Sequence, residues 1–223
     1  MSQSVGEFFR LSKHEALELA GRGRIAQTGG EVIADSFALP QITAATYGSL
    51  PSIETFVLSA DRTVTAMGSN EALIAAWMPA VERLAETVLR WTADIGVEFA
   101  GDTYITASIT PADEVNGEAH FDDDQFDPTA GAGFVAIVGD LGGPRVAAAP
   151  LPHDEIKATC PVVADDAMKA AFADGTIPSN AYGPNELVAL PQFAQLHAGP
   201  GPCGSADEVR HLLVFRGATT PTR

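Results

Sequence analysis

The feature that most constrains the fold is a succession of short β-type runs in the second half of the chain. After Gly96 the sequence changes to apolar and β-branched stretches that are broken by Gly and Pro. Many short strands of this kind are typical of a sandwich, a jelly roll or a barrel. We predict strands at 103–110, 118–122, 134–138, 145–148, 186–190, 196–197 and 209–216, and a helix at 164–173.

The first half of the chain carries the clearest helical pattern. Between residues 70 and 95, apolar side chains recur at steps of three and four, which places them on one face of a helix: Leu73, Trp77, Val81, Leu84, Val88, Trp91 and Ile95. Pro79 is predicted to kink this helix or to divide it. A capping-box sequence at 12–15 predicts a shorter helix that ends near Gly21. Weaker patterns at 31–33 and 55–58 suggest two strands.

Length and organisation favour one domain. With 223 residues, 46% of them hydrophobic, and no internal repeat or low-complexity linker, the chain can bury one good core. We predict a single domain over 1–223 that is mainly β with flanking helices. Its helical N-terminal part covers about 1–98, and its β core covers about 99–217.

The charge and composition of the chain limit the partners and the cellular location that we expect. Acidic residues number 29 against 13 basic ones, giving a net charge of −16, so a nucleic-acid partner is not expected. No apolar run approaches the roughly 20 residues of a membrane span, and residues 1–10 lack a signal-peptide pattern. We therefore expect a cytoplasmic protein. Cys160 and Cys203 lack the spacing of a zinc site and are expected to be reduced thiols.

The most suggestive chemistry lies in the unit His120-Phe121-Asp122. If this stretch is a strand, His120 and Asp122 point to the same face and can bind one metal ion. A second imidazole from elsewhere would complete the facial triad that holds non-haem Fe(II). A solvated acidic loop is the plain alternative, and a calcium loop ranks lower because the spacing of an EF-hand is missing.

Downstream residues supply the missing parts of this pattern. His197 opens a short predicted strand, a Gly/Pro loop follows, and Arg210 begins the last strand. With these residues the sequence resembles the Fe(II)/2-oxoglutarate-dependent dioxygenase superfamily, whose pattern is His-x-Asp, a distant His, and then an Arg or Lys. The resemblance covers roughly residues 100–217. The step from His197 to Arg210 is long for that family, and the segment 139–185 is long and irregular.

The resemblance implies a fold and a site. The fold is a double-stranded β-helix, also called a jelly-roll or cupin-like core, with N-terminal helices beside it. The metal ligands for Fe(II) would be His120, Asp122 and His197, and 2-oxoglutarate would bind the metal and Arg210. A buried co-substrate carboxylate needs a cation, and guanidinium offers a planar, charged fork of donors. Arg216 shares a strand face with Arg210 and is a rival anchor.

Other residues have secondary roles in this interpretation. Tyr104 is placed to reach the co-substrate carboxylate, or else is an ordinary packed tyrosine. Arg145 is a candidate substrate contact, with a surface role as the alternative. We expect His14 and His153 to be uninvolved in metal binding, and His211 to be structural because it faces the opposite side of the last strand.

The function that follows from the resemblance is an oxygenase that hydroxylates a small molecule, an amino acid or a peptide side chain. It would convert 2-oxoglutarate to succinate and CO₂. One alternative is a cupin-type metalloenzyme that uses the same ligands without 2-oxoglutarate. A second alternative, from another class, is a non-catalytic jelly-roll binding protein.

Overall fold

The computed structural model describes residues 9–10, 15, 29–114, 118–120, 133–148, 166–191, 196–205 and 207–220. Its strands are β1 (Glu31–Ala34), β2 (Ser52–Leu58), β3 (Val64–Ala66), β4 (Glu98–Phe99), β5 (Thr103–Pro111), β6 (Gly133–Gly139), β7 (Arg145–Ala147), β8 (Ser179–Ala181), β9 (Leu187–Pro191), β10 (His197–Ala198) and β11 (Val209–Thr220). Its helices are α3 (Ala44–Tyr47), α4 (Glu71–Asp94) and α5 (Asp166–Ala173). The helix predicted after residue 12 lies outside the described residues except for Glu15, which is helical.

The strands form two sheets. The large sheet has eight strands in the order β1-β9-β6-β11-β5-β2-β3, with β4 paired to β11. The small sheet has the order β10-β7-β8, and His120 joins its β10 edge through an isolated antiparallel bridge to His197. All strand pairs are antiparallel.

The order in which the chain visits the two sheets defines the fold. From β5 onward the chain crosses repeatedly between the sheets. The large sheet receives β5, β6, β9 and β11, and the small sheet receives 118–120 after β5, β7 and β8 after β6, and β10 after β9. This winding is a jelly roll, as the sequence predicts. The N-terminal part adds strands to the same large sheet, because β2 pairs with β5 and β1 pairs with β9.

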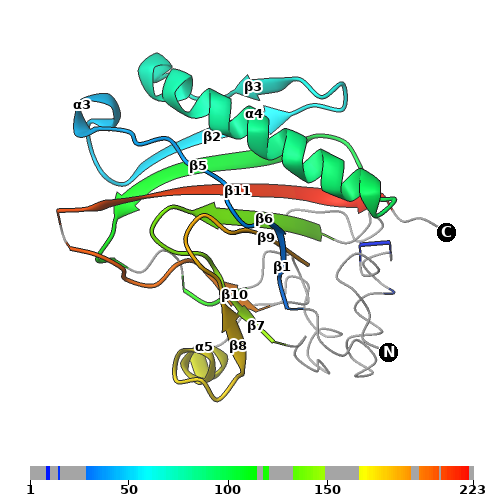
Figure 1. Ribbon diagram of the computed structural model, residues 1–223, viewed down its shortest axis with the longest axis vertical. Helices are drawn as coiled ribbons and strands as arrows, with labels where there is room; N and C mark the ends of the chain where they lie inside the picture. Colours follow the sequence, from blue (N-terminus) through cyan, green and yellow to red (C-terminus); the bar gives the residue numbers. More distant parts are fainter. Residues whose placement is uncertain are drawn as a thin grey trace.

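Two helices cover the outer faces of the sheets. Figure 1 shows α4 along one side of the large sheet and α5 on the far side of the small sheet. The predicted apolar stripe of α4 is buried against the large sheet, and the Asn70 side chain caps the helix by accepting the Leu73 N–H at 3.1 Å. Pro79 lies inside α4 without ending it, so the predicted division does not occur.

Three apolar layers follow from this stacking. The largest lies between α4 and the large sheet and includes Trp77, Leu84 and Phe215. A second joins the inner faces of the two sheets through Val135, Ile137, Val146, Leu190, Leu212 and Val214. A third and smaller one lies between the small sheet and α5, and consists of Ala119, Ala147, Phe172 and Leu196. Successive residues of β11 alternate between the first and second layers, which is the strand period of two.

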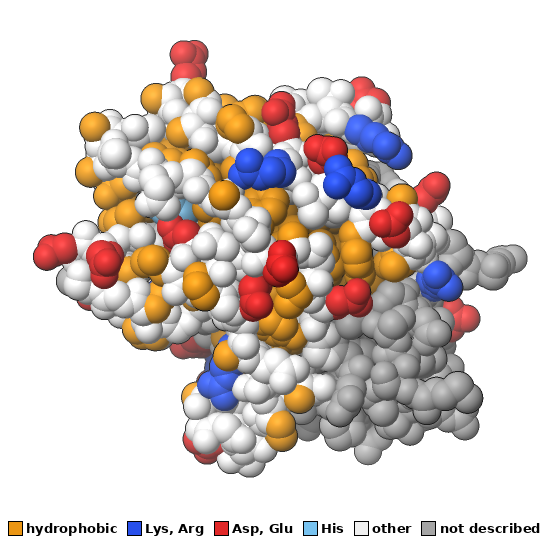
Figure 2. Space-filling model, in the orientation of Figure 1, with side chains coloured by type: hydrophobic (Ala, Val, Ile, Leu, Met, Phe, Trp, Pro, Cys, Tyr) orange, Lys and Arg blue, Asp and Glu red, His pale blue; other side chains and the backbone are white. Residues whose placement is uncertain are grey.

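Most predicted strands in the second half are confirmed, with shifts of a few residues at their ends. β3, β4 and β8 were not predicted, because each is only two or three residues long and β8, Ser-Asn-Ala, has no apolar pattern. No helix among the described residues is long and apolar enough to cross a membrane. On the face shown in Figure 2, Lys and Arg side chains are interspersed with Asp and Glu and do not form one basic patch.

Candidate metal and anion site

The structure brings His120 and His197 together on neighbouring strands. Their backbones exchange two hydrogen bonds, from the His120 N–H to the His197 carbonyl at 2.8 Å and in the reverse direction at 3.1 Å. Directly opposed residues share a face of a sheet, and the two imidazole centroids lie 4.4 Å apart. The His197 side chain is buried, and that of His120 is partly buried. Two imidazoles are therefore placed side by side.

Both rings face the interior between the two sheets. Val146 lies directly opposite His197 in the β7–β10 pair, and its side chain belongs to the layer between the sheets. The neighbours Ala119 and Leu196 point the other way, toward α5. This alternation puts the imidazoles on the inner face of the small sheet.

A local hydrogen bond selects the tautomer of His120. Its Nδ1 lies 2.6 Å from the carbonyl oxygen of Glu118, and a carbonyl can only accept, so Nδ1 carries the proton. The lone pair is then on Nε2, which is the form of imidazole that binds a metal. The Glu118 carboxylate accepts a hydrogen bond from Lys169 of α5 at 2.7 Å. That bond and the lysine charge lower the pKa of Glu118, and the same bond and the carboxylate charge raise the pKa of Lys169.

The third predicted ligand cannot be placed beside these two. Asp122 lies outside the described residues, as do His14 and His153. Within the described part of the chain, no group of three His, Cys, Asp or Glu side chains could hold a metal ion. The pair of histidines is thus the part of the predicted triad that the structure contains, and ligation by Asp122 stays a prediction.

Arg210 is fully buried at the end of the sandwich where β5 and β10 leave their sheets. Its Nη1 donates to a carbonyl at 3.0 Å, and Nη2 lies 2.9 to 3.2 Å from three more, so that the guanidinium ties two loops together through Pro200, Ala112, Gly201 and Glu114. The Cys203 sulfur is 3.4 Å from Nη2. Since Pro200 is three residues after His197, Arg210 reaches within roughly 10 Å of the histidine backbone.

Two buried polar atoms at this end have no hydrogen-bond partner among the described residues. They are Nε of Arg210 and Oγ1 of Thr110, and these two residues lie directly opposite each other on β11 and β5. An unpaired buried polar atom costs about 1–3 kcal/mol. Arg210 is fully buried, and no carboxylate among the described residues pairs with its guanidinium, so its charge is not neutralised by that part of the chain. The arrangement suits an anionic ligand that brings its own acceptors.

The other predicted contacts lie elsewhere. Arg216 is six residues further along β11, about 20 Å from Arg210, and lies opposite Tyr104, which is 43% exposed. Arg145 donates from Nε to the Ser179 hydroxyl and from Nη2 to the Phe172 carbonyl, both at 2.6 Å. Tyr104 thus lies far along the strands from Arg210, and the contacts of Arg145 are with Ser179 and Phe172 and not with Arg210.

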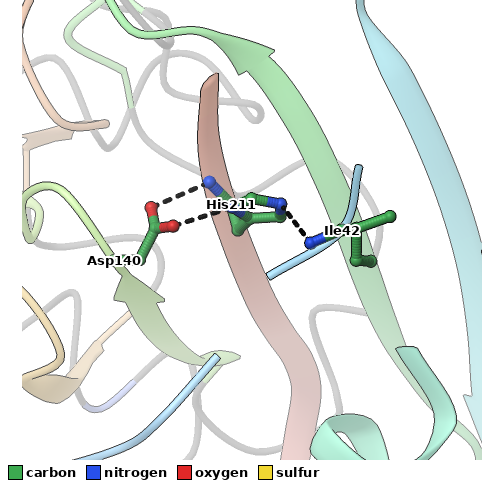
Figure 3. Close-up of polar contacts among 3 residues, drawn as sticks. All are labelled: Ile42, Asp140 and His211. Atoms are coloured by element: carbon green, nitrogen blue, oxygen red, sulfur yellow. Dashed lines mark hydrogen bonds and ion pairs between the residues drawn. The ribbon is translucent and has the colours of Figure 1, made fainter. Parts of the chain in front are cut away.

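His211 has the structural surroundings that its position on the strand predicts. Figure 3 shows its ring between Asp140 and the backbone of Ile42. Nδ1 lies 2.7 Å from the Asp140 carboxylate, and the Ile42 N–H donates to Nε2 at 3.2 Å. Both ring nitrogens are therefore used within the layer under α4, where Trp77 also contacts the ring.

Asp140→Ala is expected to destabilise the fold while leaving the metal site intact. The substitution removes the acceptor of both the His211 N–H and Nδ1–H, and two buried donors without partners cost about 2–6 kcal/mol together. Urea denaturation measures the loss. Metal binding by the folded variant should equal that of the wild type, and a weaker metal affinity would contradict the assignment of His211 to structure.

Sequence reasoning missed Thr110, Lys169 and Phe172. Thr110 becomes notable only when its strand partner is known, and Lys169 only when α5 is docked beside residue 118. No local motif marks any of the three.

Comparisons with known proteins give distant structural matches. No family model matches the chain, and no curated protein matches its sequence. Solved structures that match include EvdO2 from Micromonospora carbonacea var. aurantiaca complexed with 2-oxoglutarate, at 18% identity, 67% coverage of this chain and a TM-score of 0.38. The match spans 64% of the EvdO2 chain.

HygX from Streptomyces hygroscopicus, with nickel and 2-oxoglutarate bound, matches at 16% identity over 67% of this chain and 68% of its own, with a TM-score of 0.39. A further match is a Pseudomonas putida prolyl-4-hydroxylase, at 12% identity over 93% of this chain and 85% of its own, with a TM-score of 0.33. Two of these three structural neighbours, EvdO2 and HygX, hold 2-oxoglutarate, and the third is a prolyl-4-hydroxylase.

Proposed function

We propose that this chain is a non-haem Fe(II)- and 2-oxoglutarate-dependent oxygenase that hydroxylates a small molecule, an amino acid or a peptide side chain. The observation that carries the proposal is the pair of inward-facing imidazoles on the bridged residues His120 and His197. Asp122, two residues after His120, is proposed as the third ligand. This donor set of two neutral nitrogens and one carboxylate suits Fe(II) and leaves coordination positions open.

The structure contains features that fit such a metal. The tautomer of His120 is fixed by the Glu118 carbonyl, and the His197 ring is buried between the two sheets while the His120 ring is partly buried. Metal-binding histidines usually donate their second ring nitrogen to such a carbonyl or carboxylate, which orients the ring and raises its basicity. The residues present therefore fit a metal held between the sheets.

The proposed co-substrate site is the Arg210 end of the sandwich. Arg210 would bind the far carboxylate of 2-oxoglutarate through the donor that the loops leave unused, Nε–H, and Thr110 Oγ1 would donate a second hydrogen bond. A carboxylate offers acceptors for both and supplies the missing negative charge. Tyr104 and Arg216 are less suited, because both lie about 20 Å along the strands. Arg145 lies on β7, the central strand of the small sheet, beside Phe172 of α5, and stays a proposed substrate contact there.

The protein's share in the reaction is binding and exclusion of water. When bound, Fe(II) with 2-oxoglutarate and O₂ supplies the oxidation of a C–H bond to C–OH, with release of succinate and CO₂. The two inward-facing imidazoles would hold the metal, and the buried guanidinium of Arg210 would hold the co-substrate. The apolar layer between the sheets keeps water from both, which strengthens the charge interactions there.

One observation favours the 2-oxoglutarate-independent alternative. The Nη donors of Arg210 already bond loop carbonyls, which is also how a purely structural arginine would behave. If that is the whole role of Arg210, the histidines would serve a metalloenzyme that needs no 2-oxo acid.

A single assay separates these functions. The protein is loaded with Fe(II) under anaerobic conditions, exposed to O₂ and 2-oxoglutarate with a panel of amino acids, peptides and small metabolites, and analysed for succinate. We expect succinate release that some panel members stimulate and that the His197→Ala variant lacks. Bound iron without succinate would favour the 2-oxoglutarate-independent metalloenzyme, and absence of bound iron would favour a non-catalytic binding protein.

A further inference from the structure

Among the described residues, the strands that carry the two histidines have little backbone pairing. β10 is two residues long and pairs with β7 through His197 and Ala198, and one more bond joins the Ala147 N–H to the Leu196 carbonyl at 2.8 Å. In the same part of the chain, an isolated bridge attaches residues 118–120 to β10. Two or three hydrogen-bonded residues do not fix a strand, because each ordered residue costs about 1–2 kcal/mol of backbone entropy. Packing against a neighbouring element therefore contributes to holding the described part of these strands in register.

The outer face of the same strands is covered by α5. Phe172 is 3% exposed and packs with Ala119, Ala147 and Leu196, which flank the inward-facing positions on three neighbouring strands. The alanines leave room for the aromatic ring against the sheet. Ala119 precedes His120 and Leu196 precedes His197, so the apolar cluster that contains Phe172 includes the residue before each histidine, on the opposite face of the sheet.

Polar contacts fasten α5 across the small sheet. On one side Lys169 donates to the Glu118 carboxylate at 2.7 Å, and the carbonyl of Glu118 is the group that holds Nδ1 of His120. On the other side Arg145 of β7 donates to the carbonyl of Phe172 and stacks 4.7 Å above its ring. The helix thus joins the His120 segment to β7, with β10 between them.

The layer under α5 is separate from the main core. Its four buried residues belong to neither the layer beneath α4 nor the layer between the sheets. Loss of packing under α5 should therefore loosen the small sheet locally while the large sheet keeps most of the buried apolar area. Metal affinity and global stability can then be changed independently.

We propose that Phe172 is a positioning residue for the metal site, and that α5 sets the geometry of His120 and His197 by packing behind their strands. This role rests on the proposed metal function. By linkage, a metal ion that bridges the two histidines must also stabilise the docking of α5. The coupling requires no contact between the helix and the metal.

The test compares Phe172→Ala with a matched truncation in the main core, Leu84→Ala on α4, using Co²⁺ as the probe. Binding is measured by calorimetric titration at a temperature where every variant is folded. Phe172→Ala should weaken Co²⁺ binding roughly ten- to a hundredfold, because loss of a residue that supports a metal ligand typically weakens metal affinity by that factor. Leu84→Ala should lower the melting temperature at least as much yet bind Co²⁺ with wild-type affinity. Phe172→Leu, which refills most of the space, should recover most of the affinity.

Hydrogen exchange gives a readout that a merely structural role would leave unchanged. Adding Co²⁺ to the wild type should slow exchange of the α5 amides, and Phe172→Ala should lose this protection. Wild-type Co²⁺ affinity in Phe172→Ala, or equal weakening in Leu84→Ala, would overturn the role of Phe172 while the metal site stands. A wild-type chain that binds no Co²⁺ would overturn the metal site and this role with it.

Discussion

His197→Ala and His120→Ala are each expected to abolish iron binding while leaving the domain folded. Each substitution removes one of three proposed protein ligands, whereas the main core is formed by α4 and the large sheet. Loss of a residue that merely supports a ligand costs about 10–100-fold in metal affinity, so loss of a ligand should exceed about a hundredfold. Iron content after anaerobic loading and circular dichroism measure the two effects. Asp122→Ala should behave in the same way.

Other histidines provide the controls for this experiment. His14→Ala and His153→Ala should bind iron like the wild type, because neither belongs to the predicted triad. If His153→Ala is as damaging as His197→Ala, the metal ligands have been misassigned. The Asp140→Ala variant is a further control. It is expected to be less stable because His211 loses its partner, and to bind iron with wild-type affinity.

Arg210→Ala is expected to raise the KM for 2-oxoglutarate by roughly two to three orders of magnitude. Removing one partner of a buried ion pair costs about 3–5 kcal/mol, and about 1.4 kcal/mol corresponds to a factor of ten. The substitution also leaves loop carbonyls such as that of Ala112 without a donor, so a fall in melting temperature should accompany it. Iron affinity should hardly change. Succinate release against 2-oxoglutarate concentration gives the KM.

Neighbouring variants distinguish binding from loss of structure. Arg210→Lys should recover part of the KM, because the charge returns without the planar fork. Thr110→Val should raise the KM roughly tenfold or more while leaving the ligand-free protein as stable as the wild type, since its hydroxyl has no partner among the described residues. Arg216→Ala should be mild. If Arg216→Ala raises the KM and Arg210→Ala does not, the anchor lies six residues further along β11.

The parts of the fold that follow from local pattern could be predicted from the sequence. The stripe from Leu73 to Ile95 forms α4, and the apolar runs of β5, β6, β9 and β11 form the centre of the large sheet. The pairing of His120 with His197 agrees with the resemblance to the dioxygenase superfamily. Each of these rests on a period or a motif that is visible along the chain.

The remaining parts depend on contacts between distant segments. Nothing near Thr110 indicates that its hydroxyl is buried beside an unpaired guanidinium nitrogen, because that follows from the register of β5 against β11. The helix at 164–173 could be predicted, but its place behind the histidine strands could not. That place is decided by which surface of the small sheet carries alanines.

The central position of β11 has a consequence for the synthesis of this protein. β11 separates β5 from β6 in the large sheet, so neither can complete its pairing until residues 209–220 have left the ribosome. At about 5–20 residues per second, the roughly 100 residues that follow β5 take on the order of 5–20 s to translate. Throughout that interval the apolar strands of the nascent chain have exposed edges, which makes them natural clients for a chaperone.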